Sequence, residues 1–181
     1  MRLLPLVLTV ALAAPVSFLQ LTAAERTDTT TTTTTTTTLA KDDVKFLNGA
    51  NQCGLLEVKA AELVAKRNVT GPTADFAKKI AATHGNLNSD LSSLASKKGV
   101  TLPTVLDEDT QKKYEKLAKV EDSKLAKEYL EFEVKAHKAG VSCFKDAAAD
   151  SKDVDVKAFA AKYLSDLEMH LDEAKRLEKS L

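Results

Sequence analysis

Apolar residues recur every three or four positions through four long segments of this chain, and no other feature constrains the fold as strongly. Side chains with that spacing lie on one face of an α-helix. In the last segment the face consists of Ala160, Tyr163, Leu167, His170, Ala174, Leu177 and Leu181. Alanine, leucine, lysine and glutamate dominate these segments, and the alternation typical of strands is missing from the sequence. We therefore predict an all-α protein.

Glycine and proline are sparse after residue 41, and they mark the ends of the expected helices. Long helices are expected at about residues 42–67, 72–98, 122–145 and 153–179, with a short one at about 107–118. Four such helices pack as a four-helix bundle. The connector between the second and third long helices exceeds an ordinary helix–helix turn. It could cross the length of the bundle, as in ferritin-like topology, or it could be a decorated loop in a plain up-and-down bundle.

Residues 1–24 have the pattern of a secretory signal peptide, with Arg2 before a long apolar run that ends in small residues. A retained membrane anchor is the alternative, because the run approaches a spanning length, although prolines interrupt it. Residues 25–41 include ten consecutive threonines and have no apolar period, so we expect a disordered tether. The folded domain is then 42–181. We expect export to the periplasm or outer envelope of a bacterium, or secretion, with no membrane span after cleavage.

The balance of charges limits the classes of partner. Lysine and arginine together number 26, as do aspartate and glutamate, so the formal net charge is zero. This balance gives no electrostatic footprint for nucleic acid, and the absence of tryptophan argues against stacking platforms for bases. Nucleophile motifs, glycine-rich phosphate loops and Cys-x-x-Cys pairs are also missing. We expect no nucleic-acid partner and assign no catalytic residue.

The chain has three histidines, His84, His137 and His170, and each falls in the middle of the apolar face of a different helix. Glu57 takes the same position on the remaining long helix. With a rise of about 1.5 Å per residue, the four positions fall within about 10 Å along the bundle axis. Burying such groups singly costs several kcal/mol, so we expect them to converge on one polar centre.

Neutral imidazole and carboxylate together suit one divalent transition metal, such as zinc, copper, iron or manganese. Glu133 and Asp166 each precede a histidine by one turn and could orient its ring from outside the centre. A metal-free hydrogen-bonded network is the alternative. The chain has no Glu-x-x-His pair, which the ferritin di-iron site uses, so we expect a single metal or none.

Cys53 and Cys143 form an even pair in a chain that we expect to be exported, where disulfides persist. If the first and third long helices are antiparallel, the two cysteines lie at a similar height on one side of the centre. We predict a disulfide between them. Two buried free thiols, or Cys53 as a soft metal ligand beside Glu57, are the alternatives.

The chain resembles the bacterial domain-of-unknown-function family 4142 in four stretches, FLNGANQCGLLEVKAAELVAKR, DFAKKIAATHGNLNSDLSSLASKKGVTLP, AKEYLEFEVKAHKAGVSCF and VKAFAAKYLSDLEMHLDEAKRL. The resemblance covers residues 44–177 and implies an exported protein with a ferritin-like fold. The family's glutamate in the first helix and histidines in the next three match Glu57, His84, His137 and His170. The family commonly has an acid just before the second-helix histidine, where this chain has Thr83.

Three classes of function fit these observations. The first is an exported bundle that binds a metal ion or small ligand, with a role in envelope homeostasis or stress. The second is a structural or interaction domain with a metal-free buried network. The third is an oxidoreductase with one metal ion. The resemblance bears on the fold more than on the function, because the family has no established biochemical role. We favour the binding protein over an enzyme.

Overall fold

The structure, a computed structural model, describes residues 39–181. Every regular element in that part of the chain is a helix, which confirms the predicted all-α fold. The helices are α1 (Lys41–Lys66), α2 (Pro72–Lys97), α3 (Glu108–Ala118), α4 (Asp122–Asp150) and α5 (Val154–Glu178). The predicted signal peptide and most of the predicted tether lie outside the described residues. The tether was expected to extend to residue 41, but the Leu39 side chain is already buried in the core.

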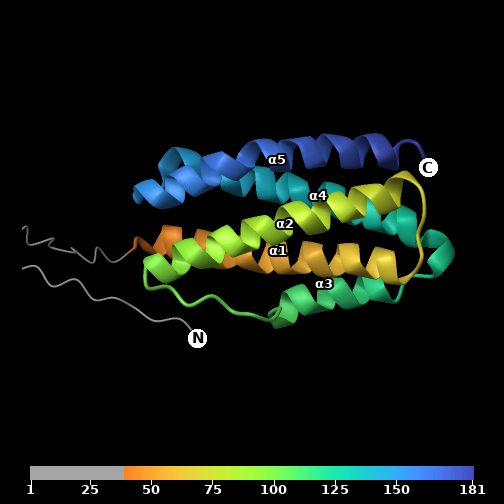
Figure 1. Cartoon of the computed structure of the whole chain (residues 1–181), viewed down its shortest axis with the longest axis horizontal. Helices are drawn as coiled ribbons and strands as arrows, with labels where there is room; N and C mark the ends of the chain where they lie inside the picture. The colour runs from red at the N-terminus through yellow and green to blue at the C-terminus, as the bar shows by residue number, and fades with distance from the viewer. Residues whose placement is uncertain (1–38) are drawn as a thin grey trace, which may run out of the picture. The chain divides into compact units, whose positions relative to one another are not determined.

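Two antiparallel pairs, α1 with α2 and α4 with α5, make the most extensive helix contacts (Figure 1). The pairs pack together through α1 against α4 and α2 against α5. The chain between α2 and α4 runs back along the length of the long helices, with α3 alongside α1 (Figure 1). As a result α2 and α4 run in the same direction, and α1 is antiparallel to α4.

Local sequence fixes where the helices begin and end. Gly71 and Gly99 adopt φ of 72° and 71°, a left-handed conformation that glycine reaches without strain. Pro72 stands in the first turn of α2, where a missing backbone N–H costs nothing. Asp107 and Asp153 cap α3 and α5, because their side chains accept hydrogen bonds from backbone N–H groups of the first turn.

The apolar core consists of two clusters, one toward each end of the long helices. One cluster includes Leu47, Leu91 and Phe144, and the other includes Val64, Ile80 and Leu130. Glu57, at 3% exposure, falls in the sequence between the parts of α1 that enter the two clusters. The histidines of α2, α4 and α5 take equivalent positions, so a polar layer separates the two clusters. None of the helices within residues 39–181 is long and apolar enough to cross a membrane.

Candidate metal centre

The structure brings together the four residues predicted for the polar centre, one from each long helix. Glu57 comes from α1, His84 from α2, His137 from α4 and His170 from α5. All four side chains are buried. Each takes a position on its helix that would otherwise hold an apolar core residue, because the helical period directs that position into the bundle.

Three imidazole nitrogens face one another inside this layer. His84 Nε2 lies 3.4 Å from His137 Nε2, and His137 Nε2 lies 3.3 Å from His170 Nδ1. Tetrahedral zinc binds imidazole nitrogen at about 2.0–2.1 Å, which places neighbouring ligand nitrogens about 3.3–3.4 Å apart. His137 thus has the spacing of a neighbouring tetrahedral ligand to both other histidines, and one ligand atom from each of the three rings lies within 4.8 Å of the other two.

The outer nitrogens of two of these rings face carboxylates. Glu57 Oε2 lies 2.7 Å from His84 Nδ1. Glu133, one turn before His137, places Oε2 at 3.2 Å and its backbone carbonyl oxygen at 3.1 Å from His137 Nδ1. Glu57 Oε1 is a further 3.6 Å contact of His137 Nδ1. Carboxylate partners of this kind fix the tautomer of a ligating histidine and raise its basicity.

These contacts decide where the protons of the neutral rings lie. If Nδ1 of both His84 and His137 carries the hydrogen that faces its carboxylate, both Nε2 atoms carry lone pairs. The two lone pairs then point at each other across 3.4 Å. That arrangement is repulsive unless a cation or a proton lies between them. The donor set therefore fits a metal ion, and its metal-free form needs one extra proton.

Burial and charge act in opposite directions on the two central groups. Burial lowers the pKa of His137, but the Glu57 and Glu133 carboxylates raise it further, to about 9. Burial raises the pKa of Glu57, but the charges of His84 and His137 outweigh it, and the net shift is downward. In the absence of metal these two groups form a buried ion pair.

The other two groups are driven toward their neutral forms. Burial lowers the pKa of His170, together with the charges of His137 and His84, to about 3. Burial also raises the pKa of Glu133. His170 therefore presents neutral imidazole, the form that binds metals.

Two aromatic residues that the site prediction left out close one side of the centre. The Phe76 ring meets the His170 ring edge-on, with centroids 6.3 Å apart. Tyr129 is fully buried, and burial followed by the charge of Glu133 raises the pKa of its hydroxyl. Both residues belong to the core cluster of Ile80 and Leu130, so the hydrophobic period marks them as ordinary core residues.

Asp166 does not join the centre, although the sequence placed it one turn before His170. It is half-buried and lines a surface hollow with Thr83, Asp90 and Lys162. The cause is the width of the buried face. One turn before His137, α4 buries the adjacent residues Glu133 and Val134. Before His170, α5 buries Leu167 and leaves Asp166 only half-buried.

The predicted disulfide is absent from the structure, where Cys53 and Cys143 are free and exposed. The buried line of α1 runs through Asn51 and Gly54, and that of α4 runs through Val141 and Phe144. Each cysteine is therefore rotated away from the core. Cysteine is also missing from both groups of potential metal ligands within the described residues, which are His84, His137, His170 and Glu57, Glu133, His137.

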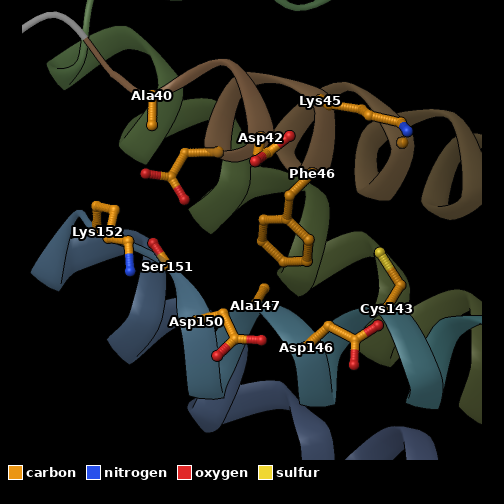
Figure 2. A pocket seen from close by; sticks show the side chains of 12 residues that line it. Ala40, Asp42, Lys45, Phe46, Cys143, Asp146, Ala147, Asp150, Ser151 and Lys152 are labelled. Atoms are coloured by element: carbon orange, nitrogen blue, oxygen red, sulfur yellow. The ribbon is translucent and has the colours of Figure 1, made fainter.

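A larger cleft of about 490 Å³ lies away from the histidines, between the beginning of α1 and the end of α4. Figure 2 shows the Phe46 ring between the carboxylates of Asp42, Asp146 and Asp150. Within the described residues the potential metal-ligand groups lie in the bundle core, and none includes these aspartates. The core centre is therefore the better candidate for a functional site.

The fold and family of the chain follow from comparisons with known proteins. No curated protein matches the chain. A DUF305 fragment from Deinococcus radiodurans has a similar structure, with a TM-score of 0.70, 10% identity, and coverage of 80% of this chain and 100% of that chain. A conserved hypothetical protein from Mycobacterium tuberculosis is also similar, with a TM-score of 0.59, 14% identity, and coverage of 77% and 92%. At these identities the likeness shows the fold alone.

The family match covers most of the chain. Residues 28–177 match the family described as "Domain of unknown function (DUF4142)". This span includes Glu57, Glu133 and all three histidines. The chain therefore belongs to the DUF4142 family.

Proposed function

We propose that this domain binds one divalent transition metal ion through His84, His137 and His170. The observation that carries the proposal is the spacing of the three inward nitrogens at 3.4 and 3.3 Å. Glu57 and Glu133 hold the outer nitrogens of His84 and His137 and contribute negative charge around the cation. The role that fits such a centre is metal binding in the cell envelope, which includes homeostasis or stress protection.

The types of ligand atom at the centre predict which metals bind most tightly. Neutral imidazole suits zinc, copper and iron, whereas manganese prefers carboxylate and water oxygens. The nitrogen spacing matches a tetrahedral ion, which favours zinc. The ferritin di-iron arrangement does not fit, because it takes a Glu-x-x-His pair from each of two helices. We therefore expect affinity to be highest for zinc or copper and lowest for manganese.

Metal titration followed by thermal unfolding tests this proposal. The protein is stripped with a chelator, each of the four metals is added, and bound metal is counted by elemental analysis. A ligand that binds only the folded state raises Tm, by an amount that grows with its concentration over Kd. One equivalent of bound metal and a raised Tm are expected. If all four metals leave Tm unchanged and none is retained, the proposal is wrong.

A metal-free polar network is the second candidate, and the raised pKa of His137 favours it. With His137 protonated, Nδ1–H donates to the backbone carbonyl oxygen of Glu133, and Nε2–H points toward His84 and His170. This arrangement also removes the repulsion between the ring lone pairs. The centre would then serve to fix the packing of the four helices. The titration above distinguishes the two candidates.

We also propose that the fold is ferritin-like and that the protein is exported. The crossover of the α2–α4 connector supports the first point. The pattern of residues 1–24 supports the second. Mass spectrometry of the protein from its native host should find a mature chain that begins near Glu25. Detection of an intact Met1 in that preparation would contradict export by cleavage.

A further inference from the structure

A small cavity of about 20 Å³ adjoins the centre on one side. Its wall includes Glu57, His84 and His137, together with the apolar residues Leu87 and Phe144. A space of this size holds about one water molecule. Because carboxylate and imidazole groups line part of the wall, a polar occupant can be hydrogen-bonded there.

The two sides of the polar layer differ. On one side the Phe76 ring packs edge-on against the His170 ring, and Tyr129 lies beside Phe76. The cavity lies on the other side, since Leu87, Phe144 and Leu167 of its wall belong to the opposite core cluster. A molecule from solvent can therefore approach Glu57, His84 and His137 from one side of the layer, whereas His170 does not line the cavity.

Two glycines form the wall where α1 and α4 meet. A Cβ atom on Gly54 would lie 2.0 Å from Asn88 Oδ1, so a side chain there would force the Asn88 side chain to move. A Cβ atom on Gly140 would meet only Leu167 Cδ1 at 3.8 Å, an ordinary contact, so packing does not require glycine at that position. A glycine inside a helix costs about 0.5–1 kcal/mol relative to alanine. Cys53, which is exposed, lies at the rim.

We propose that this cavity admits and holds one small exogenous ligand of the bound metal, a water or hydroxide at rest and a small anion in exchange. The inference rests on the proposed metal site and gives that site an open fourth position. Three histidine ligands with one exchangeable position is the arrangement of catalytic rather than structural zinc sites. Gly140 keeps the path between α1 and α4 open. The cavity itself takes one water-sized group, so a longer ligand must be narrow and extend along that path.

Cobalt substitution with azide as the probe tests the inference. Cobalt(II) takes tetrahedral zinc sites, and its visible absorption changes when a ligand is added or replaced. Azide is a narrow linear anion that can enter where larger anions cannot. The full-length protein is loaded with cobalt and titrated with azide, alongside Gly140→Ala and the matched control Gly49→Ala. Gly49 is also helical, and a Cβ there meets no other atom within 4 Å.

Azide should change the cobalt spectrum of the wild-type protein and of Gly49→Ala with equal affinity. In Gly140→Ala cobalt should still bind, but azide should bind at least about tenfold more weakly, as expected when one methyl group overpacks a filled site. Cys53→Leu narrows the rim from the side of α1 and leaves the sequence of α4 unchanged. This variant should also bind azide more weakly than the wild type.

Three results would each contradict a different part of the proposal: the metal site, the open position or the path to it. A protein that takes up no cobalt removes the proposed metal site and the open position together. A cobalt protein whose spectrum ignores azide leaves the metal site in place and removes the open position. Equal azide affinity in the wild type, Gly140→Ala and Cys53→Leu removes the path between α1 and α4.

Discussion

At the scale of single residues, the behaviour of the centre depends on which nitrogen of each ring faces inward. His84 and His137 turn Nε2 inward and Nδ1 toward a carboxylate, whereas His170 turns Nδ1 inward. His137 Nδ1 is held by the backbone carbonyl of Glu133, and His84 Nδ1 faces the Glu57 carboxylate, so both rings favour the hydrogen on Nδ1. The pKa of His170 is low, so the ring stays neutral throughout the physiological range.

His170→Ala should abolish the rise of Tm on metal addition, because two imidazoles alone bind a divalent ion far more weakly than three. The cavity and lost contacts should also destabilise the metal-free variant by about 2–4 kcal/mol. Leu177→Ala is the matched control, since it opens a cavity on the same helix away from the ligands. That control should lose stability but keep the metal response. Equal metal responses in both variants would show that His170 is not a ligand.

The metal-free protein should be most stable near pH 6.5. Its pKa values are about 3 for His170 and about 9 for His137, against an ordinary value of 6.5. Below about 6.5 only the unfolded chain protonates His170, so stability falls as pH decreases toward about 3. Above about 6.5 only the folded state keeps the proton on His137, so stability falls as pH rises through about 9.

Urea unfolding in the presence of a chelator measures this profile. The alkaline decrease should disappear in His137→Gln, which has no proton to lose. Constant stability of the wild type between about pH 6.5 and about pH 9 would mean that His137 does not hold the extra proton.

At the scale of helices, the width of the buried face decides which acids reach the centre. Glu133 on α4 and Asp166 on α5 both stand one turn before a histidine, yet only Glu133 is buried. Glu133→Gln should lower metal affinity about 10–100-fold, the usual effect of removing an outer partner of a ligating histidine. Asp166→Asn, the matched change on the other helix, should leave it unaltered. Competition with a colorimetric chelator measures the metal affinity of both variants. Equal losses of affinity would show that Glu133 is not an outer partner of His137.

The beginning of α5 is held by a cap that also joins it to α2. Asp153 Oδ1 accepts hydrogen bonds from the backbone N–H groups of Asp155 and Val156, and Asp153 Oδ2 lies 2.6 Å from Lys98 Nζ. Asp153→Ala should cost about 1–2 kcal/mol in the free energy of unfolding. Asp153→Asn keeps the cap and loses only the ion pair, so it should cost less. Urea midpoints that rank the two variants in the reverse order would refute this account.

At the scale of the whole molecule, Cys53 of α1 and Cys143 of α4 are free in the structure, so we expect packing alone to join these helices. Cys53 and Cys143 should both be alkylated in freshly isolated protein, and a reductant should leave Tm unchanged. Although the Cys53 side chain is exposed, desolvation by the protein around its thiol, together with the charge of Glu57, raises its pKa to about 11, so its alkylation should accelerate strongly as pH rises. A single linked peptide pair in a non-reducing digest would show that Cys53 and Cys143 do form a disulfide.

The sequence by itself determined the helices and the residues available for a centre. Helical period, capping aspartates and the glycines before and after α2 act over a few neighbouring residues, so their effects can be read locally. The same period placed Glu57 and the three histidines on inward faces. The helical period did not predict that Cys53 and Cys143 are exposed, because a residue at the edge of an apolar face can turn inward or outward.

The tertiary structure alone decided how those faces meet. Whether α1 runs antiparallel to α4 depends on the path of the connector, which no local pattern encodes. The inward nitrogen of each ring, the burial of Glu133 without Asp166, and the cavity beside Gly140 depend on the rotation of each helix against its neighbours. Helix rotation is set by the packing of side chains from several helices at once, so it becomes fixed only when the bundle assembles.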